Sequence, residues 1–193
     1  MKHRTTLAPA AWAHHSWLGQ RRAILSERAA RAANACLLMR FPELADGLPK
    51  DLAPVYVIPR PAFARLCRTA AALAYASQLR KIISAPARQV LVRELGPGRL
   101  RAIQLSRRAS LDPLPAPTAP DWRQRAETTA MGLLLSMRAQ PDPRQRLWLR
   151  LRLPVGVADA AGALENAVGP AVPADAAAEL RDEAHRLMRG ESC

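Results

Sequence analysis

Aromatic residues and cysteines are both scarce in this sequence. The 193 residues include four Trp, two Tyr and two Phe, so the interior must be built mainly from Leu, Ala and Val. So few rings also leave little for stacking on the bases of RNA. The three cysteines, Cys36, Cys67 and Cys193, lie far apart and form no C-x-x-C pair. They indicate reduced thiols rather than a disulfide framework or a zinc knuckle.

Glycine is scarce as well, and the motifs that depend on it are missing. Nine glycines occur, and none forms a G-x-x-x-x-G-K-[ST], G-x-G-x-x-G or G-x-S-x-G motif. H-E-x-x-H is absent, and His14 and His15 have too few further histidines for a metal site. The acidic residues of the first 120 positions are few and scattered, so no catalytic carboxylate pair is expected. The sequence therefore predicts a protein that is not an enzyme and that holds no cofactor and no metal.

Long apolar runs are also missing. No uninterrupted apolar stretch approaches the ~20 residues that cross a bilayer, so no membrane span is predicted. The opening MKHR is basic, but Pro9, two tryptophans and two histidines follow it, which makes a poor hydrophobic region for a signal peptide. We therefore expect a cytoplasmic protein.

The residues that are abundant favour helices. Ala, Leu and Arg are good helix formers, and β-branched or aromatic enrichment is confined to short runs. Within 147–153 leucines alternate with Trp and Arg, which favours a short extended segment, although each residue is also an acceptable helix former. The predicted fold class is all-α, a compact multi-helix domain with proline-rich loops and one short extended segment.

The stretch 61–108 carries the clearest helical pattern. Apolar residues recur at steps of three and four over 61–84, and Ile82 and Ile83 continue this stripe, which predicts one helix with a buried face. Ser84 is placed to cap a second helix that ends near Gly96, and a third short helix follows. We expect the three helices to form a compact hairpin.

Proline content divides the chain into four parts. Residues 1–16 show no sustained period and are expected to form a flexible N-terminal tail. Residues 17–109 are predicted to be a helical core domain, which opens with a helix over 17–40. Four prolines within 110–121 predict a semi-rigid linker. Residues 122–193 are expected to form a C-terminal helical part.

Signals within the C-terminal part differ in strength. Asp121 is placed to cap a helix that begins at 122. The glycines and prolines of 155–173 indicate a weakly ordered linker or a marginal helix. Asp175 is placed to cap a final helix that stops at Gly190.

The net charge of +13 is unevenly distributed. Residues 61–120 hold ten Lys and Arg against two Asp and Glu, whereas residues 121–193 hold ten of each. Such an excess is compatible with nucleic acid, an anionic membrane surface or an acidic protein as a partner, because the field does not distinguish the chemistry of the countercharge.

DNA binding is the alternative that this charge raises most directly. The segment 84–108 resembles a helix-turn-helix, with Gly96 at the turn and four arginines in the second helix and just beyond it. Val92 stands where that motif usually has a small residue, and Pro97 and Gly98 lengthen the break. Nucleic acid is therefore disfavoured as the partner.

Several of these segments together resemble a known family. An early His-His-Ser-Trp-Leu lies at 14–18, and a proline-rich loop and an Ala/Leu helix ending in RKII follow it. Then come V-L-x-x-E-L-G at 90–96 and R-L-R-L-P at 150–154. In order and texture the chain resembles the SctK family of bacterial type III secretion, in particular its Hrp-type branch.

The resemblance implies a helical, non-enzymatic adaptor of the cytoplasmic sorting platform. Its partners would be the cytoplasmic domain of the inner-membrane ring protein and the SctQ-type platform protein, which places it at the cytoplasmic face of the inner membrane. Members of the family lack catalytic residues, so none is expected here. We predict that Arg80, Lys81 and Arg88, near the break at Ser84, contribute to the partner-binding surface.

Overall fold

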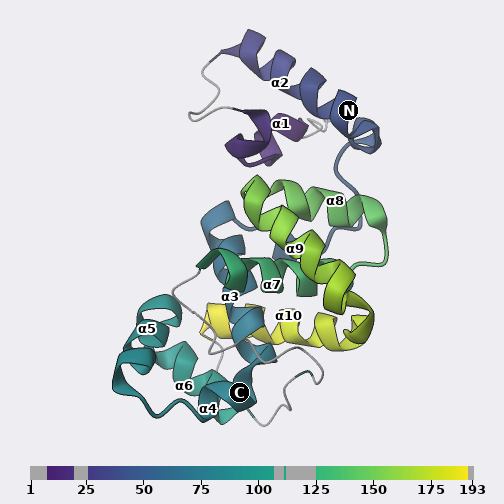
Figure 1. Cartoon of the computed structure of the whole chain (residues 1–193). Coiled ribbons are helices and arrows are strands. Elements are labelled where there is room, and N and C mark those ends of the chain that lie inside the picture. The colour runs from purple at the N-terminus through teal and green to yellow at the C-terminus, as the bar shows by residue number, and fades with distance from the viewer. Residues whose placement is uncertain (1–7, 20–25, 107–110, 112–124, 191–193) are drawn as a thin grey trace.

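Helices make up all the regular secondary structure that the structure describes. The structure is a computed structural model, and it describes residues 8–19, 26–106, 111 and 125–190 (Figure 1). No strand occurs in these residues, so the all-α prediction is confirmed. The helices are α1 (Pro9–Trp12), η1 (His15–Leu18), α2 (Glu27–Arg40), η2 (Pro42–Asp46), η3 (Pro54–Tyr56), α3 (Arg60–Ala74), α4 (Ala76–Arg80), α5 (Ala85–Leu95), α6 (Pro97–Leu105), α7 (Arg125–Arg138), α8 (Pro143–Leu151), α9 (Val155–Val168), η4 (Gly169–Ala171) and α10 (Ala174–Arg189).

Helix α3 lies at the centre of the fold. It packs against α7 and α10, and α7 packs in turn against α9 (Figure 1). Phe63, Leu66 and Leu73 of α3 are fully buried, and each such burial stabilises the fold by ~1.5–3 kcal/mol. A Cβ built on Gly132 of α7 would lie 1.8 Å from the carbonyl oxygen of Cys67. The two helices therefore cross with their backbones in close contact.

This packing bears on the predicted division into parts. Helix α3 belongs to 17–109, whereas α7 and α10 belong to 122–193. Since these three helices pack on one another, the two parts share one core and are not separate units. Of the predicted linker 110–121 only Leu111 lies within the described residues, and the cap at Asp121 lies outside them.

The single helix predicted over 61–84 is wrong. The chain breaks at Tyr75, between α3 and α4, and α4 ends at Arg80. The carbonyl of Ala74 accepts a hydrogen bond from the backbone N–H of Leu111 at 3.3 Å, while the N–H of Gln78 turns to the Tyr75 carbonyl at 3.0 Å. The bond from Leu111 thus takes the place of the α-helical hydrogen bond from Gln78 to Ala74 that would have continued α3.

Helix α5 begins and ends close to the predicted positions. Ser84 is its N-cap residue, but the Ser84 side chain makes no capping hydrogen bond. Gly96 ends it with φ of 86°, a conformation that favours glycine. The third helix, α6, starts directly at Pro97, so the connection is one residue long.

Residues 8–16, expected to form part of a flexible tail, are instead docked on the body. The indole N–H of Trp12 donates to the carbonyl of Trp148 at 2.6 Å, and that of Trp17 donates to the carbonyl of Leu153 at 2.8 Å. The backbone N–H of His14 donates to the carbonyl of Leu151 at 2.6 Å. The acceptors are carbonyls in the last turn of α8 and just beyond its end, where backbone carbonyls lack helical partners, so the bonds hold this segment on the body.

The helix predicted over 17–40 is likewise interrupted. Trp17 belongs to η1, and α2 begins at Glu27, where the Ser26 hydroxyl accepts from the N–H of Ala29 at 3.2 Å. The serine supplies an N-cap in the middle of the predicted helix, so the chain restarts there.

The predicted extended segment 147–153 is wrong, because α8 covers residues 143–151. Asp142 caps this helix by accepting from the N–H of Arg144 at 2.8 Å. Trp148, Leu149 and Leu151 are all fully buried. Because this helix is buried on more than one side, its apolar residues need not follow helical spacing. The alternation of leucines with Trp and Arg therefore occurs without a strand.

Helix α9 is more regular than the sequence indicates, whereas helix α10 was predicted. Residues 155–168 form α9, whose first backbone N–H, that of Val155, donates to the Ser16 hydroxyl at 2.9 Å. Of the two alternatives that the sequence left open there, the helix is the one observed and the weakly ordered linker is wrong. Helix α10 stops at Gly190 as predicted, with φ of 76°. Asp175 lies in its first turn, and Pro173 takes the N-cap position.

Candidate protein-docking surface

Helices α4, α5 and α6 form a lobe beside the central helices. In Figure 1 they lie together at the lower left, away from α8 and α9. Helix α6 packs against both α4 and α5 and touches α10. We call residues 76–106 the basic lobe.

The charge of the basic lobe is almost entirely positive. It contains six Lys and Arg and one acidic residue, Glu94. The Glu94 side chain is only 5% exposed, and its carboxylate lies 3.7 Å from the guanidinium of Arg93, which is 68% exposed. The surface of the lobe therefore presents cations to solvent with little accessible negative charge.

The three predicted site residues all lie on this lobe and are all exposed. Arg80 is the last residue of α4, Lys81 follows it, and Arg88 lies in the first turns of α5. The guanidinium of Arg80 donates to the carbonyl of Ser106 at 2.9 Å, which ties the end of α4 to the end of α6. The structure thus places the three cations on either side of the α4–α5 connection.

The lobe also exposes large apolar side chains. Ile83 is 93% exposed and Leu105 is 70% exposed. The sequence pattern had placed Ile83 on the buried stripe of one long helix, which is wrong because α4 ends before it. The signal that could have revealed it is the run R-K-I-I-S-A-P-A-R at 80–88, where cations bracket an apolar segment.

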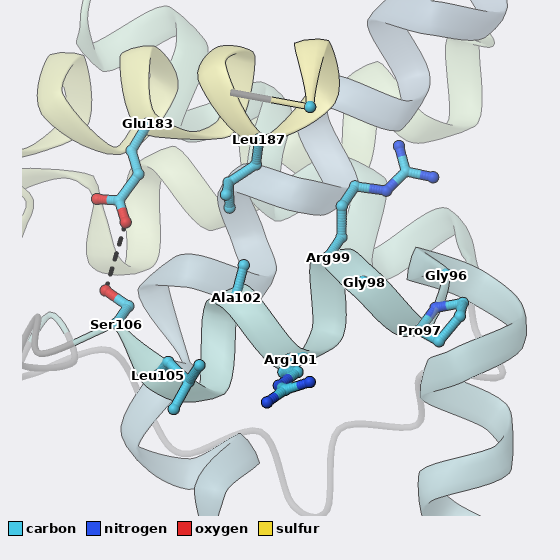
Figure 2. A pocket seen from close by; sticks show the side chains of 11 residues that line it. Gly96, Pro97, Gly98, Arg99, Arg101, Ala102, Leu105, Ser106, Glu183 and Leu187 are labelled. Atoms are coloured by element: carbon cyan, nitrogen blue, oxygen red, sulfur yellow. Dashed lines mark hydrogen bonds between the residues drawn. The ribbon is translucent and has the colours of Figure 1, made fainter. Parts of the chain in front are cut away.

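A groove of about 630 Å³ separates the lobe from α10 (Figure 2). Leu187 projects from α10 toward Ala102 of α6, and Arg101 and Leu105 lie on the α6 side. At one end the Ser106 hydroxyl donates to the Glu183 carboxylate at 3.3 Å. The groove combines apolar and cationic groups, which suits contact with a protein better than catalysis on a small polar substrate.

Titratable groups elsewhere do not form a catalytic cluster in the part of the chain that the structure describes. Burial raises the pKa of the Cys67 thiol to about 12, so it stays protonated at neutral pH. Burial, with positive charge from His15 and Arg60, lowers the pKa of His14. No group of three His, Cys, Asp or Glu side chains in these residues could hold a metal ion.

A buried arginine holds the loop before α3. Arg152 is 4% exposed, donates to the carbonyls of Tyr56 and Ile58, and lies with its guanidinium carbon 4.4 Å from the centre of the Trp12 ring. Burial, followed by the charge of Arg60, lowers the Arg152 pKa to about 10, so it remains charged at neutral pH. Its contacts are internal, so we assign it to the fold rather than to the docking surface.

The geometry of α5 and α6 disfavours the helix-turn-helix alternative. A single residue, Gly96, separates the two helices. The exposed positions of α6 are Pro97, Gly98, Arg101 and Leu105, and only Arg101 has a side chain that can read base edges. Arg99 and Gln104 of the same helix are half-buried and donate to the carbonyls of Leu95 and Leu79, so α6 offers few side-chain groups for base edges.

Comparison with known proteins gives no further guide, since no family model, curated protein or solved structure matches the chain. Among the described residues, no helix is both long and apolar enough to cross a membrane.

Proposed function

We propose that this protein is a non-enzymatic adaptor of a type III secretion apparatus, which links the inner-membrane ring to the cytoplasmic sorting platform. The type III assignment comes from the sequence resemblance, and the structural observation that supports a docking role is the basic lobe, where six cations accompany one nearly buried carboxylate. A surface of this kind attracts and orients an acidic protein domain.

Two further features support an adaptor. The described residues form a helical body with one continuous core, so a partner bound at the lobe is held rigidly relative to α8 and α9. Apolar groups at Leu105 and in the groove beside α10 lie next to the cations. Charge would set the rate and orientation of encounter, and apolar contact would set affinity.

Two of the segments that suggested the SctK family lie in contact in the fold. The H-H-S-W-L segment at 14–18 contacts the R-L-R-L-P segment at 150–154 through His14 and Trp17, although the two are far apart in the sequence. Ser16 adds the bond that caps α9. The contact shows that both segments take part in the same fold, whereas the family resemblance itself comes from the sequence alone.

The docking proposal is tested by reversing the three predicted cations together. Arg80, Lys81 and Arg88 are changed to Glu, and capture of the ring protein's cytoplasmic domain is measured by pull-down at physiological salt. The matched control reverses three exposed cations outside the lobe, Arg28, Arg31 and Lys50.

We expect the lobe variant to lose capture and the control to keep it. Circular dichroism of both variants checks that the helices are intact. Undiminished capture by the lobe variant would refute the assignment of these three residues.

DNA binding is the second candidate, and only the charge of the lobe favours it. A DNA-binding protein would retard random duplex at low salt and release it steeply as salt rises. An adaptor would instead co-purify with platform components at physiological salt.

A further inference from the structure

The connection between α4 and α5, together with the first turn of α5, forms an apolar tip within the basic lobe, and the adaptor proposal makes no use of its exposed Ile83. Residues 82–87, Ile-Ile-Ser-Ala-Pro-Ala, contain no charge, and Ile83 is 93% exposed. Ser84, Ala85 and Pro86 are exposed as well. We call 82–87 the apolar tip. Because Ile83 is almost fully exposed, a partner that covered it would gain nearly the whole transfer free energy of an isoleucine side chain.

Cations border the apolar tip on both sides. Arg80 and Lys81 precede it, Arg88 follows it, and Arg93 lies further along the exposed side of α5. No Asp or Glu occurs between Asp51 and Glu94. The tip is thus an uncharged segment framed by positive charge, with no carboxylate in its own stretch of chain to repel an anionic surface.

We propose that the apolar tip binds the surface of an anionic lipid bilayer. Ile83 would enter the boundary between headgroups and acyl chains, while Arg80, Lys81 and Arg88 lie among the lipid phosphates. A Lys or Arg near such a surface strengthens binding about fivefold, so three of them supply most of the affinity. The inference goes beyond the adaptor role, because it concerns lipid rather than a protein partner.

The size and composition of the tip favour a bilayer over a protein pocket. The centre of a stable protein interface is enriched in aromatic residues. The tip has six residues and no aromatic side chain. A bilayer needs only a short apolar segment and adjacent charge, and it imposes no fixed geometry on the lysine and arginine side chains.

The electrostatic contribution of the cations and the apolar contribution of Ile83 to vesicle binding respond differently to salt. Attraction between the cations and anionic headgroups is screened over ~10 Å at 0.1 M salt and over ~3 Å at 1 M. The transfer of Ile83 out of water is not screened. Binding to vesicles should therefore require anionic lipid and weaken as salt is added. The contribution of Ile83 should be the same at low and at high salt.

The test is co-sedimentation of the full chain with vesicles. One set is phosphatidylcholine alone, and the other is an equimolar mixture of phosphatidylcholine and phosphatidylglycerol. The full chain should partition to the mixed vesicles at ~0.1 M salt, and far less to the neutral ones or at ~1 M. Absence of binding to the mixed vesicles, or equal binding to both, would overturn the proposal.

Matched variants separate insertion from simple charge attraction. Ile83→Ser should weaken partitioning to mixed vesicles about tenfold, whereas Met39→Ser, which changes a side chain 77% exposed on α2, should leave it unchanged. Reversal of Arg80, Lys81 and Arg88 should abolish binding, and reversal of Arg28, Arg31 and Lys50 should reduce it far less. Equal effects of the two serine variants, or of the two triple variants, would contradict a specific tip.

The same Ile83→Ser variant keeps this inference distinct from the adaptor proposal. It should capture the isolated cytoplasmic domain of the ring protein as well as the unaltered chain does. If Ile83→Ser lost that capture while vesicle binding was unchanged, Ile83 would contact protein and the bilayer inference would be wrong. Failure of the triple reversal to affect capture would instead refute the assignment of Arg80, Lys81 and Arg88 to protein docking.

Discussion

The close crossing of α3 and α7 makes one substitution especially informative. In most helices Gly→Ala is stabilising by ~1 kcal/mol, because alanine restricts the unfolded chain and favours the helix. At Gly132 the added methyl group would lie 1.8 Å from the carbonyl oxygen and 2.3 Å from the carbonyl carbon of Cys67. Both are backbone atoms of α3, which cannot swing aside as a side chain would.

The expected cost of Gly132→Ala follows from this geometry. Ordinary contact lies near 3.4 Å or beyond, so the helices must separate by more than an ångström along their central contact. Overpacking costs ~1–3 kcal/mol and more where the backbone must move, so we expect a loss of about 3 kcal/mol in the free energy of unfolding. For a chain of this length that lowers the melting temperature by roughly 6–12 °C.

Thermal unfolding followed by far-ultraviolet circular dichroism measures the effect. The matched control is Gly162→Ala in α9, where the nearest atom to a new Cβ is a side-chain nitrogen of Arg150 at 3.9 Å. That variant should be neutral or stabilised by up to ~1 kcal/mol. If Gly132→Ala unfolded at the same temperature as Gly162→Ala, the close crossing of α3 and α7 would be refuted.

Three further predictions follow from buried polar and titratable groups. Trp12→Phe should lower the free energy of unfolding by ~1–3 kcal/mol, since the Trp148 carbonyl loses its donor, and chemical denaturation measures this. Iodoacetamide should modify exposed Cys36 in the native chain and Cys67 only after unfolding, as mass spectrometry of digested protein can show. Burial raises the pKa of Tyr75 to about 12, so the folded state keeps a proton that the unfolded chain loses above pH ~10. Stability should therefore fall between about pH 10 and 12, and a Tyr75→Phe variant should show a shallower fall.

Local signals in the sequence were sufficient for some helices. The stop at Gly190 and the limits of α5 at Ser84 and Gly96 agree with the structure, because these ends depend on the backbone preferences of a few residues. The all-α class also follows from composition.

Long-range contacts determined what the sequence pattern could not predict. Trp12 and Trp17 dock a segment expected to be mobile, through carbonyls 136 residues away. The end of α3 depends on a bond from Leu111, and the exposure of Ile83 depends on where the chain breaks after it. No periodicity within a short window contains this information.

The candidate site, like the fold, could be predicted from the sequence only in part. The sequence predicted Arg80, Lys81 and Arg88 as partner-binding residues from charge near a helix break, and the structure shows only that all three are exposed. It did not reveal the groove beside α10, because Leu187 and Ala102 come together only in the folded chain. The identity of the partner remains a prediction.

The measurement that bears most directly on the adaptor role is calorimetric titration of the ring protein's cytoplasmic domain into the two triple-reversal variants. The proposal predicts that reversal of Arg80, Lys81 and Arg88 weakens binding at least about tenfold, while reversal of Arg28, Arg31 and Lys50 leaves the affinity near that of the unaltered chain. Equal affinity of the two variants for that domain would contradict docking through the basic lobe.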